Sequence, residues 1–560
     1  MHTVFRIDEI RQVDKKCPLY QVDLKLTSDD DQQLRRLTDR IRQETSGSTG
    51  WHRMGQLLLK IGQFDKAEEL YTALLEQASN DSAKAYIYNQ LGEMKNGKGQ
   101  YTEAASFYEM SLEIYRRTLP EDHLSLANIY NNIGLAYYNM GDYSKAVEFH
   151  KKTIKIKEKT LSPDDPDLAL SYNNIGGVYN NMGDYSKALE FYEKSFKIRE
   201  KALPPNHPDL AQSYNNIGGV YNYMGDYSKA LEFYEKAHKI LEKALPSNHP
   251  DLAIFYNNIG QVYNSMGDYS KALEFYEKSY KIYEKTLPSN HPHLATSYNS
   301  IGQVYNNMGD YSKALEFYEK SFKIREKALP PNHPDLAQSY NNIGGVYNYM
   351  GDYSKALEFY EKAHKIDEKA LPPNHPELAT SYNNIGAVYK NMGDYSKALE
   401  FYEKSHKIFE KALPSNHPSL ATSYSNIGEV YNDMGDYSKA LEFYEKSHKI
   451  REKALPSNHP HLATSYNNIG AVYKNMGDYS KTLEFYEKSH KIREKALPSN
   501  HPDLANSYNN IGLVYGNMGD YSKALSFLEK ALSILQKSLP PNHPYIIMVT
   551  NSINNVKKKM

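Results

Sequence analysis

The stretch from Tyr172 to Lys187, YNNIGGVYNNMGDYSK, decides the fold of this chain because it recurs almost unchanged along the sequence. Weaker copies, Lys98-Gly-Gln-Tyr and Ile61-Gly-Gln-Phe, precede the regular ones. A period of this length is typical of a solenoid, in which each repeat is one small unit that packs against its neighbours. The hexapeptide Met-Gly-Asp-Tyr-Ser-Lys marks the period, 42 residues each time, and it begins at Met140, Met182, Met224, Met266, Met308, Met350, Met392, Met434, Met476 and Met518.

Each repeat is predicted to begin with an amphipathic helix and a tight turn. In the unit that starts at Ser171, the apolar residues Tyr172, Ile175 and Tyr179 fall at helical spacing and form one face. A glycine follows at position 183, and glycine adopts a left-handed conformation at little steric cost. The pattern therefore predicts that the chain reverses direction at Gly183.

A second helix is predicted after this turn. It runs from about Tyr185 to Leu203 and is stopped by Pro204. The next helix begins at His207-Pro208, where a polar cap residue precedes a proline in the first turn. One repeat is thus a helix, a turn, a second helix and a linker.

Small and aromatic residues share the predicted interface of each hairpin. Gly176 and Ala188 are expected to face each other and to let the two helices approach closely. The 51 tyrosines of the chain occupy copied positions and are expected to fill the wider gaps. Each hairpin leaves apolar faces that only neighbouring hairpins can cover.

This pattern resembles the tetratricopeptide repeat, and the 42-residue period with its Lys-Ala-Leu-Pro-x-Asn-His-Pro linker resembles the kinesin light chain subtype. The resemblance implies an all-α, right-handed superhelical solenoid of about twelve helix-turn-helix repeats over residues 48–540, with the first helices on the concave side. It also implies a scaffold that binds proteins or peptides. The residues that carry it are Tyr172, Ile175, Gly176, Tyr179, Gly183, Tyr185, Ala188 and Tyr192, and in the earliest copy Trp51, Gly55, Leu58, Gly62, Phe64, Ala67 and Tyr71.

Paired asparagines form a polar stripe on the predicted first helices. An asparagine both donates and accepts hydrogen bonds, so a row of them suits the main chain of an extended peptide. In the family, asparagines at matching places hold peptide backbone; the alternative is a merely solvated consensus face. The predicted peptide-binding residues are Asn173, Asn174, Asn215, Asn216, Asn257, Asn258, Asn299, Asn341, Asn342, Asn383, Asn384, Asn426, Asn467, Asn468, Asn509 and Asn510.

Selectivity is expected from groove positions that vary between otherwise near-identical repeats. Neutral drift after duplication is the alternative explanation of this variation. The predicted selectivity residues are Gln261, Gln303, Lys390, Glu429, Asp433 and Lys474.

Composition argues against several classes of partner. The chain has 67 Lys and Arg against 68 Asp and Glu, and it therefore lacks the basic excess typical of a nucleic-acid binder. No apolar run approaches the ~20 residues of a membrane-spanning helix. The one cysteine, Cys17, cannot form an internal disulfide, so a reducing, cytoplasmic location is expected.

The histidines occupy two repeated positions and predict no metal site. One precedes a proline, as in His207-Pro208, and is expected to cap a helix; copies lie one hairpin apart, too far to share a metal ion. The other, as in His238, alternates with Phe196 and Tyr280, which indicates packing. Gly176-Gly177 lies inside a helix and lacks the pattern of a phosphate-binding loop. We therefore expect no enzyme, no catalytic residues, no cofactor and no metal.

The two ends of the chain depart from the repeat. Residues 1–47 are predicted to form two strands and a helix, with strands near Val4–Ile10 and Leu19–Leu26 and a helix from Asp29 to Glu44. Residues 541–560 are predicted to be a capping helix with a basic tail. Residues 1–46 also faintly resemble the closing strands of arginine-specific ADP-ribosyltransferase domains, although the Glu-x-Glu motif of that family has no match here.

Three functions remain open from the sequence. The first is an intracellular protein-binding scaffold, of which a light-chain role beside a motor is one version, although no motor-binding heptads precede the repeats in this sequence. The second is a truncated or split ADP-ribosyltransferase-associated chain whose repeats serve as its targeting region. The third is a structural spacer with an unused groove.

Overall fold

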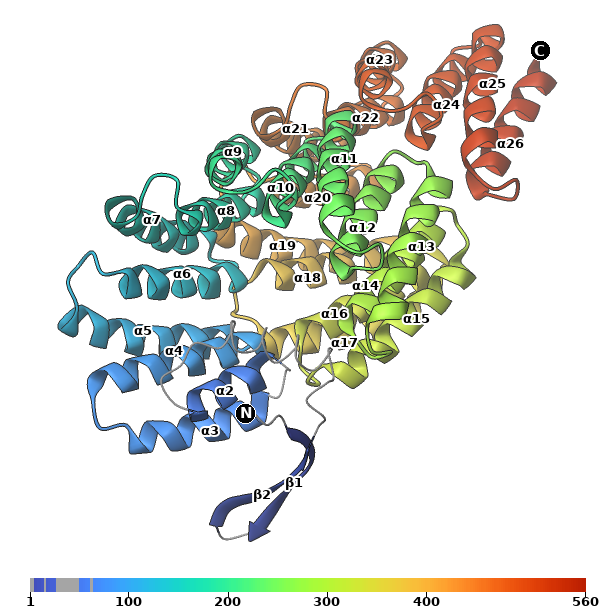
Figure 1. The fold of residues 1–560 in the computed structure, drawn as a ribbon. Helices are drawn as coiled ribbons and strands as arrows, with labels where there is room; N and C mark the ends of the chain where they lie inside the picture. The colour runs from blue at the N-terminus through green and yellow to red at the C-terminus, as the bar shows by residue number, and fades with distance from the viewer. Residues whose placement is uncertain (1–4, 15–16, 27–49, 61–63) are drawn as a thin grey trace.

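The computed structural model describes residues 5–14, 17–26, 50–60 and 64–560 of the chain, as Figure 1 shows. Strand β1 (Phe5–Asp14) pairs antiparallel with β2 (Cys17–Leu26), and the register shifts at two places. Both strands are longer than predicted, since β1 continues past Ile10 to Asp14 and β2 begins at Cys17, before Leu19. The helix predicted between residues 29 and 44 lies outside the described residues.

The described helices form twelve consecutive hairpins and one further helix. The first helices of the repeats are α2 (Gly50–Lys60), α4 (Asp81–Gly97), α6 (Leu124–Asn139), α8 (Pro166–Asn181), α10 (Pro208–Tyr223), α12 (Pro250–Ser265), α14 (Pro292–Asn307), α16 (Pro334–Tyr349), α18 (Pro376–Asn391), α20 (Pro418–Asp433), α22 (Pro460–Asn475), α24 (Pro502–Asn517) and α26 (Pro544–Lys559). The second helices are α3 (Phe64–Gln77), α5 (Tyr101–Thr118), α7 (Tyr143–Thr160), α9 (Tyr185–Ala202), α11 (Tyr227–Ala244), α13 (Tyr269–Thr286), α15 (Tyr311–Ala328), α17 (Tyr353–Ala370), α19 (Tyr395–Ala412), α21 (Tyr437–Ala454), α23 (Tyr479–Ala496) and α25 (Tyr521–Ser538).

The predicted start and stop signals are confirmed in the repeat α8–α9. Gly183 has a φ of 71°, the left-handed conformation that reverses the chain. The next residue, Asp184, accepts a hydrogen bond from the main-chain N–H of Lys187 and so caps α9. The histidine His207 caps α10 in the same way, because its Nδ1 atom accepts the N–H of Asp209 at 3.2 Å.

The core is a chain of small clusters, each shared by one second helix and the following first helix. Ala230 and Tyr234 of α11 pack against Ile259 and Val262 of α12, and the same four positions recur in the neighbouring repeats. The glycine and the alanine of a hairpin face each other as expected, since a Cβ atom at Gly218 would lie 3.2 Å from the main-chain oxygen of Ala230. The glycine of the first helix lies under the tyrosine ring of the second, since a Cβ atom at Gly218 would lie 3.0 Å from Tyr234.

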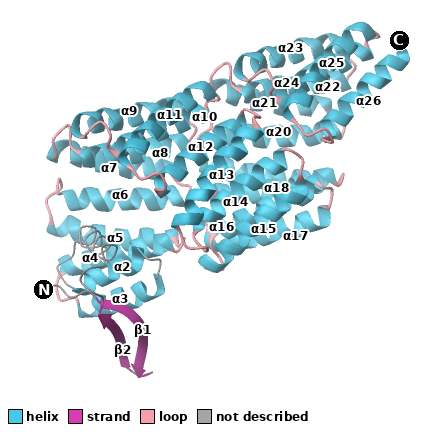
Figure 2. Cartoon of the chain, turned by 45° about the vertical axis from the view of Figure 1, so that its right-hand side comes forward, coloured by secondary structure: helices cyan, strands magenta, loops and turns pink. Residues whose placement is uncertain are grey.

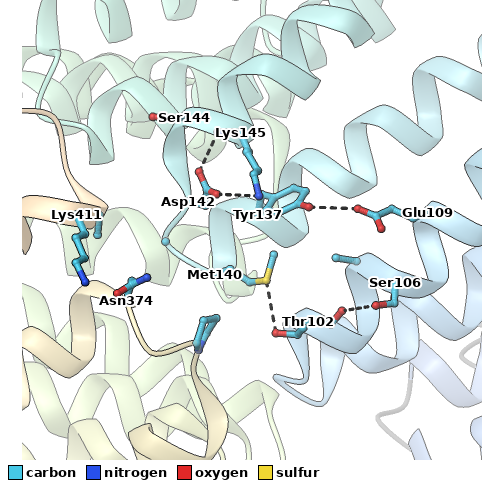
Figure 3. Close-up of a pocket in the computed structure, with 14 residues that line it drawn as sticks. Thr102, Ser106, Glu109, Tyr137, Met140, Asp142, Ser144, Lys145, Asn374 and Lys411 are labelled. Atoms are coloured by element: carbon cyan, nitrogen blue, oxygen red, sulfur yellow. Dashed lines mark hydrogen bonds and ion pairs between the residues drawn. The ribbon is translucent and has the colours of Figure 1, made fainter. Parts of the chain in front are cut away.

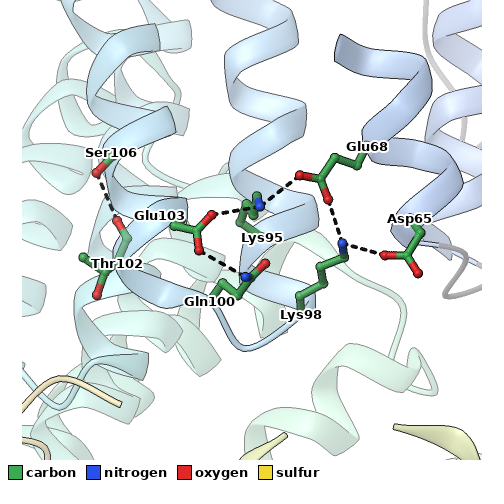
Figure 4. A network of polar contacts seen from close by, with 8 residues as sticks. All are labelled: Asp65, Glu68, Lys95, Lys98, Gln100, Thr102, Glu103 and Ser106. Atoms are coloured by element: carbon green, nitrogen blue, oxygen red, sulfur yellow. Dashed lines mark hydrogen bonds and ion pairs between the residues drawn. The ribbon is translucent and has the colours of Figure 1, made fainter. Parts of the chain in front are cut away.

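The first two hairpins are held by ion pairs that the regular repeats lack (Figure 4). The Lys95 ammonium lies 2.9 Å from Glu68 and 2.8 Å from Glu103. The Lys98 ammonium lies 2.7 Å from both Asp65 and Glu68. Lys98 stands where the later repeats have methionine, so this network replaces part of the apolar packing at the turn.

The array winds into a superhelix in which later repeats lie alongside earlier ones, as the two views in Figures 1 and 2 show. Four histidines join the successive turns of this superhelix. Each Nε2 atom lies 2.9–3.1 Å from a main-chain carbonyl oxygen 236 residues earlier, a separation of between five and six repeats. The pairs are His375 with Asn139, His417 with Asn181, His459 with Tyr223, and His501 with Ser265.

Proline and tyrosine side chains complete this contact, which we call the seam. It joins the Met-Gly-Asp turn inside an earlier hairpin to the His-Pro linker between two later hairpins. A Cβ atom at Gly183 would lie 2.7 Å from Cδ of Pro418, so the proline ring covers the turn closely. Tyr143 packs against the cluster that contains Leu413 and Leu420. The seam therefore buries apolar surface as well as forming hydrogen bonds.

None of the described helices combines the length and the apolar composition that crossing a lipid bilayer requires.

Candidate peptide-binding groove

The first helices line the inner side of the curved stack. Helix α12 contacts α14, and α16 contacts α18, although a second helix separates each pair along the chain. Helices that approach each other across an intervening helix lie on the inner, shorter path of a curved array. The asparagine stripe therefore follows the concave surface.

The asparagines of this surface bind one another across the repeats. The Nδ2 group of the second asparagine in one repeat donates to Oδ1 of the first asparagine in the preceding repeat, at 2.6 Å for Asn258 and Asn215 and 2.9 Å for Asn510 and Asn467. The pairs at this position are Asn132 with Asn89, Asn174 with Asn131, Asn216 with Asn173, Asn258 with Asn215, Asn342 with Asn299, Asn426 with Asn383, and Asn510 with Asn467. We call this set the asparagine ladder.

The ladder is a structural role that the sequence analysis missed. Its signal was present in the sequence: an Asn-Asn dipeptide repeated every 42 residues places two asparagines 43 residues apart on adjacent inner helices. Each bond in the ladder uses one N–H of the donor and one lone pair of the acceptor. An asparagine amide has two N–H groups and two lone pairs, so both members keep capacity for a ligand.

The other predicted asparagines lie on the same surface outside these pairs. Asn257 accepts a hydrogen bond from the Ser300 hydroxyl at 3.1 Å, so serine continues the ladder there. The Oδ1 atoms of Asn341 and Asn509 are buried without a hydrogen-bond partner. Apart from the buried Asn509, the predicted asparagines are half-buried, including Asn384 and Asn468, which take part in no ladder bond.

The predicted selectivity residues include one charged group on α18 and α20. The Lys390 ammonium lies 2.7 Å from Glu429, and the lysine side chain is the more buried of the two. Partial burial and the neighbouring Glu429 carboxylate raise the pKa of Asp433, while Lys390 opposes that shift. The structure thus brings Lys390, Glu429 and Asp433 together.

The remaining selectivity residues lie apart from this group. The Gln303 amide donates to Asn307 at 3.0 Å and accepts from the hydroxyl of Tyr318 at 3.2 Å. Gln261 is exposed on α12, and Lys474 is half-buried on α22. The variable positions therefore form several separate features along the inner surface.

Comparison with known families agrees with this geometry. Models of the tetratricopeptide repeat match residues 51–85, 81–159, 167–243, 252–293, 293–369, 377–453 and 461–537. The chain belongs to the tetratricopeptide repeat family. Arrays of these repeats are protein-interaction scaffolds, and the kinesin light chain-like subtype expected from the 42-residue period is also represented among similar solved structures.

Two such structures illustrate the similarity. A kinesin light chain candidate from Podosopora anserina with nearly identical TPR-like repeats is 28% identical, with a TM-score of 0.31, over 37% of this chain and 98% of that chain. BtubC (BKLC) from P. vanneervenii is 23% identical, with a TM-score of 0.33, over 41% of this chain and 90% of that chain. No curated protein sequence matches the chain.

The histidines of these tetratricopeptide repeats have the structural roles predicted for them. The histidine before each proline caps a first helix, as His333 does for α16. The histidine of the second position stacks on a tyrosine, with ring centroids 4.4 Å apart for His406 and Tyr424. Within the described ranges no group of three or more His, Cys, Asp and Glu side chains could hold a metal ion.

An open cleft of about 520 Å³ lies beside the seam, next to Gly141 (Figure 3). It lies between α5, the turn that begins at Met140, and the linker that contains Pro372 and Asn374. Two polar pairs line it: the Tyr137 hydroxyl donates to Glu109 at 3.2 Å, and Lys145 lies 3.5 Å from Asp142.

Proposed function

We propose that the chain is a scaffold that binds an extended peptide segment along the inner surface of its tetratricopeptide array. The observation that carries this proposal is the placement of half-buried asparagine amides on the inner first helices, with hydrogen-bonding capacity beyond the ladder. Main-chain N–H and C=O groups occur in every peptide, so such amides would bind a peptide largely independently of its side chains.

The charged group formed by Lys390, Glu429 and Asp433 supports a degree of selectivity within this groove. The ion pair of Lys390 and Glu429 is only partly buried, and its polar atoms can therefore exchange partners with a ligand. A ligand with both a basic and an acidic residue would fit this position better than a uniformly acidic or basic one. The asparagines of the flanking repeats would add main-chain contacts, and Lys474 of the following repeat would add a positive charge.

The ladder determines which variants test this proposal. Replacing Asn383 or Asn467 would remove a ladder bond and weaken the stacking of the repeats. Asn341, Asn384 and Asn468 lie on the same surface outside the ladder, so the triple Asn→Ala variant at these three positions tests binding with less effect on stability. The matched control is a triple Lys→Ala variant on the exposed outer helices at Lys407, Lys449 and Lys491.

The measurement is binding to a library of extended peptides, followed by affinity determination for the peptides that bind. We expect the inner triple variant to lose about fivefold or more in affinity, because two or three hydrogen bonds of about 0.5–1.5 kcal/mol each are removed. The outer triple variant should bind like the wild type. Unchanged affinity of a folded inner variant would exclude the asparagine surface as the binding site.

A further inference from the structure

Only about half of the turns and linkers of the repeats take part in the seam. Six turns on the early repeats, at Gly99, Gly141, Gly183, Gly225, Gly267 and Gly309, each contact the histidine or proline of a linker on the later repeats. The later repeats carry the same Met-Gly-Asp turn on their opposite edge. The early repeats carry the matching linkers on theirs, with His-Pro at residues 207, 249 and 291, His-Leu at residue 123 and Asp-Pro at residue 165. Both of these edges lie outside the seam.

The uncovered turns keep the sequence of the covered ones but not their surroundings. A Cβ atom at Gly435, Gly477 or Gly519 would have no atom within 4 Å, whereas one at Gly183 would meet Pro418. The methionine of each uncovered turn is about half exposed, for instance 52% at Met434. The five uncovered turns are those at Gly351, Gly393, Gly435, Gly477 and Gly519.

The uncovered linkers likewise keep the groups that form the seam. The side chains of His207 and His249 are 38% and 33% exposed, and each already accepts a main-chain N–H through Nδ1, which leaves Nε2 to donate. The corresponding Nε2 atom of His417 forms a seam hydrogen bond. The two free edges are therefore complementary in the same way as the two edges that already meet inside the chain, except at Asp165, which replaces the histidine of one linker.

We propose that a second copy of this chain docks its free linkers onto the free turns, so that the seam continues from one molecule to the next. Helix α26 takes the place of the first helix of a thirteenth repeat. The first repeat of the following copy therefore takes the place of a fourteenth repeat. Inside the chain a turn meets the linker six repeats later, as the turn after α4 meets the linker before α16. Counting in this way pairs the turns at Gly435, Gly477 and Gly519 with the linkers that end at His123, Asp165 and His207 of the second copy.

This interface is head-to-tail, since the turn edge of one copy meets the linker edge of the next. Each added copy presents a fresh turn edge, and the association therefore forms an open helical filament instead of a closed dimer. Asp165 caps α8 in one of these three linkers, as a histidine does in the others. Its side chain is too short to reach a main-chain carbonyl of the neighbouring copy. The copy-to-copy contact thus has two histidine hydrogen bonds where the internal seam has four.

Two variants block one edge each. In the turn-blocked variant, Met434, Met476 and Met518 are replaced by Glu, which places carboxylates on the exposed turns. In the linker-blocked variant, Leu124, Pro166 and Pro208 are replaced by Glu at the first position of their helices, where an acidic residue is favourable for the helix. The control replaces Lys407, Lys449 and Lys491 by Glu, which changes the net charge more but lies on exposed positions in the middle of outer helices.

The measurement is sedimentation velocity over a range of protein concentrations, with circular dichroism to confirm helix content. We expect the wild type and the control to form a concentration-dependent series of oligomers and each blocked variant to be monomeric. A mixture of the two blocked variants should form dimers and no larger species, because one supplies linkers and the other supplies turns. A monomeric wild type, blocked variants that associate like the wild type, or a control that loses association would each overturn the proposal.

Discussion

The Nε2 atom of His417 lies 2.9 Å from the main-chain carbonyl oxygen of Asn181, a residue 236 positions earlier in the chain. The other nitrogen of this imidazole, Nδ1, accepts the N–H of Ser419 at 3.0 Å and caps α20. Because Nδ1 accepts, Nε2 carries the proton and donates to the carbonyl. One side chain therefore ends a local helix and also joins two turns of the superhelix.

The first prediction separates these two roles. Asparagine caps a helix but is too short to reach across the seam. We expect the combined His→Asn replacement at His375, His417, His459 and His501 to keep the helix content and to loosen the superhelix, because each site loses a hydrogen bond of about 0.5–1.5 kcal/mol. Small-angle scattering should report a larger radius of gyration. The same replacement at His249 and His291, which lie outside both the internal seam and the copy-to-copy contact, should leave the radius unchanged. An unchanged radius for the seam variant would show that the histidines do not hold the turns together.

The second prediction concerns acid. Burial holds the pKa of His417 below its ordinary value of 6.5, and the hydrogen bond to the Asn181 carbonyl opposes this shift. A lowered folded-state pKa means that the contribution to stability is present above pH 6.5 and is lost as the pH falls through the folded value. Burial also lowers the pKa of His375, His459 and His501. The charged groups that lie near these histidines are, in the same order, Glu377, Arg451 and Asp503.

We therefore expect the wild type to be compact at neutral pH and to expand at a midpoint below pH 6.5. The radius of gyration, measured across an acid titration, checks this. The variant with asparagine at the four seam positions should show no such transition, and an identical transition in that variant would assign the expansion to other groups.

The third prediction uses two glycines of identical sequence context. Gly183 and Gly435 both have a positive φ, 71° and 82°, so alanine costs roughly 1–2 kcal/mol in backbone strain at either position. Only Gly183 lies against Pro418. We expect Gly183→Ala to lower the urea midpoint more than Gly435→Ala, and to expand the chain in scattering measurements. Equal effects would mean that the covered turn gains no stability from the seam.

The fourth prediction concerns a buried carboxyl group. Asp367 is 3% exposed, and burial together with the nearby Glu377 raises its pKa to about 7. Because the folded-state pKa is raised, the buried carboxyl group costs no stability below pH 3.8. Above pH 7 the free energy of unfolding is lowered by the full cost of ionising it, up to roughly 4 kcal/mol for a shift of this size. Leu241 fills the equivalent position in another repeat.

We expect Asp367→Leu to raise the stability at pH 8 and to have much less effect at pH 4. Urea denaturation at the two pH values measures the difference. Glu368→Leu, which removes an exposed carboxylate on the same helix, is the control and should change little at either pH. A gain at pH 8 no larger than that of the control would show that Asp367 is not ionised against its surroundings.

The sequence of one repeat predicts the face on which a groove residue lies, but not the residue that it contacts. The inner position of residues such as Asn258 followed from helical spacing together with the family resemblance, and the contacts between first helices agree with it. The bond from Asn258 to Asn215 was not predicted, because the spacing indicates which face a side chain occupies but not which neighbour it reaches. The contact of Lys390 with Glu429 depends in the same way on the stacking of two repeats.

The sequence by itself determined the helices, their caps and the packing of each hairpin on the next. These features depend on residues within one period, such as Gly183, Asp184 and His207, and most copies carry the same residues. Only the tertiary structure decided which copies meet at the seam. Met182 and Met434 lie in identical hexapeptides, yet one is covered and the other is exposed, because the small rotation between adjacent repeats accumulates over six repeats before the chain returns to itself.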